Sequence, residues 1–144
     1  NTFKAALLHD IGKDIDINIA KTIMEEHFKD YLNMPKFSYH QFIGSYLAKH
    51  DFNVKSKEVL EAIKYHATGK ANMGKIGKVV YASDKIEPTR GFDSSSLISA
   101  SINDYEVGFI EVLKSNKEYL LAHNADINNE LTLQCMTQYL DKND

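Results

Sequence analysis

Apolar residues recur at helical spacing along nearly the whole chain, and few residues interrupt that pattern. Val59 and Ile63 share one such stripe, and Ile76 and Val80 share another. Only two prolines and seven glycines are present, so long stretches can remain helical. The period-two alternation that marks β-strands is nearly absent. The 144 residues fit one domain with a buried core, and we predict a single all-α domain over residues 1–144.

The breaks between the stripes give the expected helix boundaries. We predict helices over residues 2–10, 17–31, 38–50, 56–69, 74–86, 103–122 and 129–140, with a loop over 89–96. Gly12 lies where a left-handed C-terminal cap would follow the first helix. Ser38 and Gln41 form a capping-box pattern at the start of the third helix, and Ser56 is placed to cap the fourth.

Charge and cysteine usage exclude several classes of function. The formal net charge is −3 and no block of lysine or arginine is present, which argues against a nucleic-acid partner. Cys135 is the only cysteine, so an internal disulfide and a cysteine-based zinc site are both excluded. No apolar run reaches the length of a membrane span and no signal peptide is visible, so we expect a cytoplasmic protein without membrane contact.

Several histidine and aspartate side chains fall on faces that are otherwise apolar. Five of them lie on predicted core faces: His9, Asp10, His40, His66 and Asp84. Asp84 follows Val80 by four residues, so a carboxylate points where the core should be. Asp10 stands seven residues after Phe3 and three after Leu7, which assigns it to the same predicted face. We therefore expect these polar groups to meet inside the fold.

A buried carboxylate needs a cation or several hydrogen-bond donors near it. A single histidine on an apolar stripe is more often a hydrogen-bonded core residue than a ligand, and a helical scaffold with buried histidines stays an alternative. Five such groups from four predicted helices favour a metal site instead. Imidazole and carboxylate ligands suit zinc, manganese or iron, and the lack of thiolates argues against a purely structural zinc site.

The run at residues 7–13, LLHDIGK, resembles the signature segment of the HD-domain superfamily of metal-dependent phosphohydrolases. The later pieces follow in the order of that superfamily: His40 with Gly44, His66 within AIKYHATG, and Asp84 within YASDKIEP. The pieces YHATG and DKIEPTR are similar to the YqeK-type branch, the symmetrical bis(5′-nucleosyl)-tetraphosphatases. The resemblance covers nearly the whole chain.

The resemblance implies an HD-domain helical bundle with two divalent metal ions, iron first and manganese or zinc as alternatives. Asp10 would bridge the ions, His9 and Asp84 would complete the first ligand set, and His40 and His66 would complete the second. The implied activity is a phosphoric anhydride hydrolase that cleaves diadenosine tetraphosphate to two ADP. A hydroxide activated by both ions would attack an inner phosphorus atom.

Four residues are candidates for contacts with the substrate. Lys13 could donate to a phosphate from the end of its helix, although a lysine also suits a helix C-terminus for structural reasons. Arg90 could bind a phosphate with its planar fork, or be a solvated loop residue. Thr68 and Gly69 would shape the binding pocket. We take Asp10, Lys13 and Arg90 as the catalytic candidates.

One feature of the family is missing from the sequence. The family carries a further metal-binding histidine on a helix before the His-Asp pair, whereas no histidine precedes His9 here. Either an N-terminal helix has been lost from this chain or that ligand is absent, and we expect the loss of the helix. The open alternatives are an HD-domain phosphohydrolase for another nucleotide and a non-catalytic module that senses a nucleotide. The expected partner is a dinucleoside polyphosphate or another nucleotide, and a homodimer is compatible with the sequence.

Overall fold

Short helices joined by turns make up the part of the chain that the computed structural model describes, residues 1–86, 99, 101–124 and 127–141, and no strand occurs there. The helices are α1 (Thr2–Leu8), α2 (Ile17–His27), α3 (Tyr39–His50), α4 (Lys57–Lys64), α5 (Lys75–Lys85), α7 (Tyr105–Ala122) and α8 (Glu130–Leu140), with 3₁₀ turns η1 (Lys29–Tyr31) and η2 (Lys36–Ser38). The predicted all-α class is confirmed. None of these helices is both long and apolar enough to cross a bilayer.

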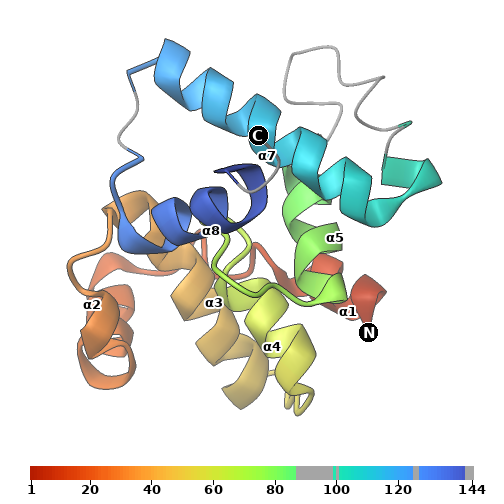
Figure 1. The fold of residues 1–144 in the computed structure, drawn as a ribbon. Coiled ribbons are helices and arrows are strands. Elements are labelled where there is room, and N and C mark those ends of the chain that lie inside the picture. Colours follow the sequence, from red (N-terminus) through yellow and green to blue (C-terminus); the bar gives the residue numbers. More distant parts are fainter. Residues whose placement is uncertain (87–98, 100, 125–126, 142–144) are drawn as a thin grey trace.

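The helices pack in a sequential chain of contacts (Figure 1). α3 lies beside α4, α4 beside α5, and α5 leads up to α7, which crosses the top of the view. α1 packs against both α4 and α5, α2 packs on α3, and α8 packs below α7. The C-terminal end of α1, the start of α3, the end of α4 and the end of α5 are thereby brought into one region.

Three groups of buried apolar residues hold these helices in place. Ile63 and Val80 belong to the first, which joins α1, α3, α4 and α5. Phe109 belongs to the second, between α5, α7 and α8, and Met24 and Phe42 belong to the third, between α2, α3 and the first turn of α8. Burying each large apolar side chain contributes about 1.5–3 kcal/mol, so α3 and α5, which each join two groups, have firmly fixed positions.

The first helix is shorter than predicted. α1 ends at Leu8, and its buried residues are Ala5 and Leu8, whereas Phe3 and Leu7 are 78% and 68% exposed. The helical face that we assigned to Asp10 is therefore wrong. Asp10 reaches the site because the chain turns after the helix has ended, not because it continues a buried stripe.

The prediction of a left-handed cap at Gly12 is also wrong, because the only glycine with a positive φ among the described residues is Gly69. Gly12 is needed for a close approach of two backbones. A Cβ atom there would lie 2.6 Å from the backbone nitrogen of Gly44, and closer still to the carbonyl oxygen of His40. The absence of a side chain lets the His-Asp segment rest on the start of α3.

Helix ends elsewhere follow the sequence with three corrections. α2 ends at His27 and is followed by a separate 3₁₀ turn, and α4 ends at Lys64 rather than near residue 69. The capping box at α3 does not form, because the hydroxyl of Ser38 donates to the carbonyl of Pro35 at 2.6 Å. The cap at Ser56 is confirmed. The predicted loop over 89–96 lies outside the described residues.

Candidate metal centre

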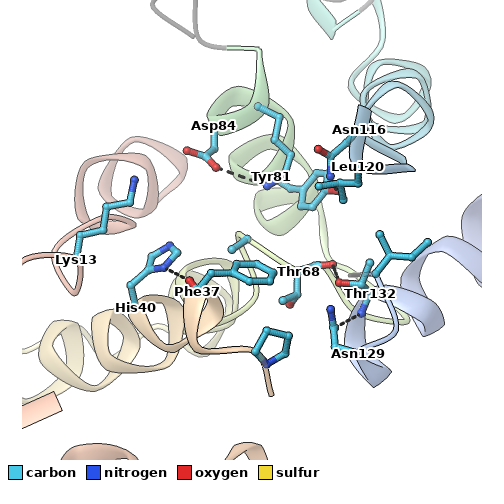
Figure 2. A pocket seen from close by; sticks show the side chains of 14 residues that line it. Lys13, Phe37, His40, Thr68, Tyr81, Asp84, Asn116, Leu120, Asn129 and Thr132 are labelled. Carbon is cyan, nitrogen blue, oxygen red and sulfur yellow. Dashed lines mark hydrogen bonds and ion pairs between the residues drawn. The ribbon is translucent and has the colours of Figure 1, made fainter. Parts of the chain in front are cut away.

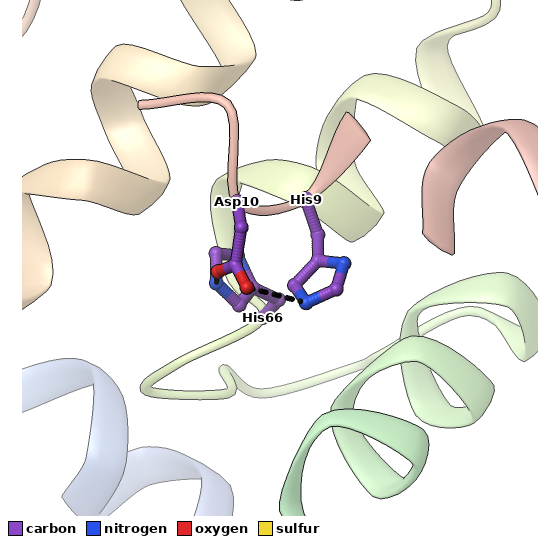
Figure 3. Close-up of side chains that lie close together, drawn as sticks. All are labelled: His9, Asp10 and His66. Carbon is purple, nitrogen blue, oxygen red and sulfur yellow. Dashed lines mark ion pairs between the residues drawn. The ribbon is translucent and has the colours of Figure 1, made fainter. Parts of the chain in front are cut away.

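The five predicted metal ligands lie together at the junction of α1, α3, α4 and α5. His9 and Asp10 occupy the turn after α1, His40 the first turn of α3, and Asp84 the last turn of α5. His66 lies in the turn after α4 and is 1% exposed. Figure 3 shows His9, Asp10 and His66 facing one another. Only two of the five lie within helices, so turns contribute more to the site than the predicted helical stripes.

The ligand atoms approach one another closely. His9 Nε2 is 3.2 Å from Asp10 Oδ2 and 3.4 Å from Asp84 Oδ1. His66 Nε2 is 3.6 Å from Asp10 Oδ1 and 3.0 Å from His40 Nε2. Asp10 therefore lies between two groups, one with His9 and Asp84 and the other with His40 and His66.

Each histidine ring is held by its other nitrogen. The Nδ1 atoms bind backbone carbonyl oxygens three residues earlier, His9 to Ala6 at 2.5 Å, His40 to Phe37 at 2.7 Å and His66 to Ile63 at 2.7 Å. A carbonyl oxygen can only accept, so each Nδ1 carries the proton. In the neutral rings the Nε2 lone pairs then point into the centre, which is the orientation that a metal ligand requires.

The centre lacks a partner for some of its acceptor atoms. Within the described ranges, Asp10 Oδ1 is buried and has no hydrogen-bond donor. The Nε2 atoms of His40 and His66 face each other as acceptors when both rings are neutral. The Lys13 ammonium lies 3.4 Å from Asp10 Oδ1 without forming a hydrogen bond, and a metal cation among these groups would satisfy the remaining acceptors. Ligand atoms of His9, Asp10 and His66 all lie within 4.8 Å of one another. The prediction that histidine and aspartate side chains form a cluster that could hold a metal ion is therefore confirmed.

The surroundings shift the pKa values of the site residues. Contact with His66, with the charges of His9 and Lys13 adding to it, lowers the pKa of Asp10 to about 2. Burial, and then the nearby His66, lower the pKa of His40 below its usual value. The hydrogen bond to Asp84 raises the pKa of His9. Asp10 is thus ionised at neutral pH, and the lowered pKa of His40 favours its neutral form, which are the forms that bind metals. The raised pKa of His9 favours its protonated form, with which a metal would compete.

A cavity of about 400 Å³ adjoins the centre, within the range of about 300–1,000 Å³ that is typical of small-molecule sites. In Figure 2, charged and ionisable residues lie at one end and amides and apolar side chains at the other: Lys13, His40 and Asp84 face Asn116, Leu120 and Asn129. Thr68 and Tyr81 lie between the two ends. The cavity could therefore take a ligand with an anionic part and a less polar part.

Two of the four predicted substrate-binding residues line the cavity. Lys13 lines the cavity, half exposed, with its Nζ 3.4 Å from Asp10 Oδ1. Thr68 also lines the cavity. Gly69, with φ of 72°, turns the chain so that its Cα packs against Cys135, and a Cβ there would lie 2.6 Å from the sulfur. Arg90 lies outside the described residues. Their contacts with substrate stay predictions.

Gln41, which we predicted to cap the start of α3, supports the candidate metal centre instead. Its side chain is fully buried, and its Oε1 accepts from the backbone N–H groups of Ala67 and Thr68 at 3.0 and 3.2 Å. Its Nε2 donates to the Thr68 hydroxyl at 3.0 Å. The available signal was its position on one stripe with Ser45 and Ala48, at helical spacing. Gln41 fastens the turn that carries His66 to α3.

The model of the HD-domain family matches residues 1–89, more than half of the chain. The chain belongs to the HD-domain family. The superfamily resemblance seen in the sequence is thereby confirmed.

Several proteins similar to this HD domain carry a common name. The symmetrical bis(5′-nucleosyl)-tetraphosphatase of Bacillus subtilis is 29% identical over 129 residues, which cover 85% of this chain and 68% of the relative. The Staphylococcus aureus protein of the same name is 27% identical over 140 residues, covering 94% of this chain and 72% of its own. The predicted resemblance to the symmetrical bis(5′-nucleosyl)-tetraphosphatases is therefore confirmed.

A solved structure supports the fold of this HD domain. A protein of Clostridium acetobutylicum, described as a predicted HD superfamily hydrolase involved in NAD metabolism, superposes with a TM-score of 0.76. The match covers 98% of this chain and 76% of the other, at 24% identity. The helical architecture is thus shared.

Proposed function

We propose that this HD domain is a metal-dependent hydrolase that cleaves diadenosine tetraphosphate symmetrically into two molecules of ADP. The observation that carries the proposal is the convergence of three imidazoles and two carboxylates at the charged end of a cavity. The shared name of the similar proteins from two bacteria supports the same substrate.

Two divalent ions, iron first and manganese or zinc as alternatives, would be held by two overlapping ligand sets. His9 and Asp84 would form the first set with Asp10, and His40 and His66 would form the second with the same carboxylate. The contacts of 3.2–3.6 Å between Asp10 and the two histidines nearest to it support this division. When bound, such ions lower the pKa of a coordinated water and neutralise charge on phosphoryl oxygens.

The residues of the chain supply binding and orientation. Asp10, with its pKa of about 2, remains a carboxylate over the whole working range of pH. Lys13 lines the cavity beside the centre, so its ammonium group can donate to a phosphate oxygen. Arg90 is proposed as a second phosphate-binding residue on the resemblance alone. A cytoplasmic location and a homodimeric state also stay predictions.

The test is product identification from protein purified without oxygen, after its metal content has been measured. Incubation with diadenosine tetraphosphate should yield ADP as the sole nucleotide product. Formation of ATP and AMP would refute symmetrical cleavage. Turnover of mononucleotides alone would indicate another HD-domain phosphohydrolase, and binding without turnover would indicate a nucleotide sensor.

Two variants link the activity to the proposed ligands. His66→Ala and Asp84→Ala should lose metal and hydrolysis while the far-ultraviolet circular dichroism retains most of its helical signal. His27→Ala is the matched control, because His27 is an exposed residue at the end of α2 whose ring packs at a tilt against Tyr46, away from the candidate metal centre. If the His66 and Asp84 variants retain full metal and activity, the ligand assignment is wrong.

A further inference from the structure

Lys85 makes three contacts at the edge of the candidate metal centre. Its ammonium nitrogen is 2.9 Å from the carbonyl oxygen of His66 and 3.5 Å from Asp84 Oδ2. It also lies 3.9 Å from the centroid of the Tyr81 ring. One ammonium group thus contacts the side chain of one proposed ligand and the backbone of another.

The ion pair with Lys85 stabilises the Asp84 carboxylate at an unfavourable place in the helix. Asp84 and Lys85 are the last two residues of α5, where the negative end of the helix dipole disfavours a carboxylate and favours a cation. Only 12% of the Asp84 side chain and 11% of the Lys85 side chain are exposed, so water screens neither charge well. The lysine offsets the cost of keeping a carboxylate at this helix end.

The contact with His66 connects two separate elements. His66 lies in the turn after α4, while Asp84 belongs to α5. The Nδ1 atom of His66 already binds its own helix end, so its ring follows the backbone of that turn. By binding the His66 carbonyl, Lys85 fixes this turn against the end of α5 and sets the separation of the two ligands.

We propose that Lys85 is a positioning residue, which holds Asp84 and the His66 turn in the arrangement that binds metal. This inference rests on the metal site of the proposed function. It predicts whether the metal affinity rises or falls when Lys85 is replaced. A cation beside a ligand carboxylate repels a metal ion, so removing the lysine would strengthen metal binding if charge alone mattered. If Lys85 positions the ligands, its removal weakens metal binding.

The experiment is a calorimetric titration of the metal-free protein with Mn²⁺. Lys85→Met keeps most of the length of the side chain and its apolar stem but removes the ammonium group, and Lys85→Gln removes the charge with less change in polarity. Loss of an outer contact to a metal ligand typically costs 10–100-fold, so we expect the Mn²⁺ affinity to fall at least about tenfold in both variants. If the methionine variant fails to fold, the glutamine variant decides.

Lys13→Met is the matched control for charge. Lys13 pairs with the other ligand carboxylate, Asp10, at a similar distance of 3.4 Å, but its side chain is 49% exposed. Water can replace this exposed contact, and the described contacts of the Lys13 side chain do not join Asp10 to a second ligand-bearing element as those of Lys85 do. Removal of Lys13 should therefore leave the Mn²⁺ affinity unchanged or raise it. Unchanged or tighter binding in both Lys85 variants would overturn the positioning role while leaving the metal site intact. Failure of the wild-type protein to bind Mn²⁺ would overturn the metal site itself, and the inference with it.

A second measurement separates positioning from phosphate binding. At saturating Mn²⁺, Lys85→Met should keep the wild-type KM for diadenosine tetraphosphate, because its defect lies in loading the ion. A KM raised about tenfold with unchanged Mn²⁺ affinity would show that Lys85 acts on the substrate instead.

Discussion

The Nε2 atoms of His40 and His66 lie 3.0 Å apart, although the two residues belong to different elements and are 26 positions apart in the sequence. Both rings donate through Nδ1 to backbone carbonyls, so two lone pairs meet when the rings are neutral. Burial lowers the pKa of His40, which disfavours the proton that could join them. A metal ion near both nitrogens would resolve this conflict.

We therefore expect His40→Ala to lose at least one bound ion per chain. Loss of a direct ligand should cost no less than loss of an outer contact, so hydrolysis should fall by at least about 10–100-fold. Metal analysis after gel filtration measures the first effect and an ADP-release assay the second. His123→Ala, at the exposed C-terminal end of α7, is the control. Full metal occupancy in the His40 variant would exclude it as a ligand.

Gly12→Ala should destabilise the protein and disturb the centre together. The new methyl group would collide with the backbones of His40 and Gly44, neither of which can move without shifting α3. Overpacking of this kind costs about 1–3 kcal/mol in free energy of unfolding, measured by urea denaturation. The displaced start of α3 should also weaken metal binding.

Gly74→Ala is the matched control for that substitution. A Cβ atom at Gly74 would meet only the carboxylate of Glu58, at an ordinary 3.9 Å. Gly74 is the N-cap of α5, where alanine is less favourable than glycine, so the free energy of unfolding should fall by no more than about 1 kcal/mol. Equal effects of the two substitutions would mean that the close approach at Gly12 carries no special cost.

The sequence predicted the features that depend on local apolar spacing, and it did not predict those that depend on contacts between distant segments. Apolar spacing determined the helical class and the span of α5 to within one residue, because that helix buries one continuous face. Spacing failed for Asp10, which enters the site through a turn after α1 has ended. The contact of Gly12 with α3 is set by tertiary packing, and no local pattern encodes it.

Gln41 illustrates the same limit and supplies a further prediction. Its Oε1 satisfies two backbone N–H groups in the turn after His66, and Gln41→Leu would leave both without that acceptor. Each unsatisfied buried group costs about 1–3 kcal/mol, so we expect a loss of about 2–6 kcal/mol in free energy of unfolding. Gln134→Leu is the control, because Gln134 is exposed and bonds only to Glu130 in the contacts described for it. A loss below about 1 kcal/mol at Gln41 would show that water replaces the amide.

Cys135 should be chemically silent in the folded protein. Burial raises the pKa of its thiol from an ordinary value of 9 to about 12, so almost no thiolate is present at pH 8. Because the pKa is higher in the folded than in the unfolded state, its contribution to stability is complete below about pH 9 and is lost as the pH rises towards 12. Cys135 is the only cysteine, so a thiol reagent such as dithionitrobenzoate reports on it alone. We expect one thiol to react rapidly in guanidinium chloride and slowly, at the rate of unfolding, in native buffer at pH 8. Rapid labelling of the native protein would contradict the burial of Cys135 between α5 and α8.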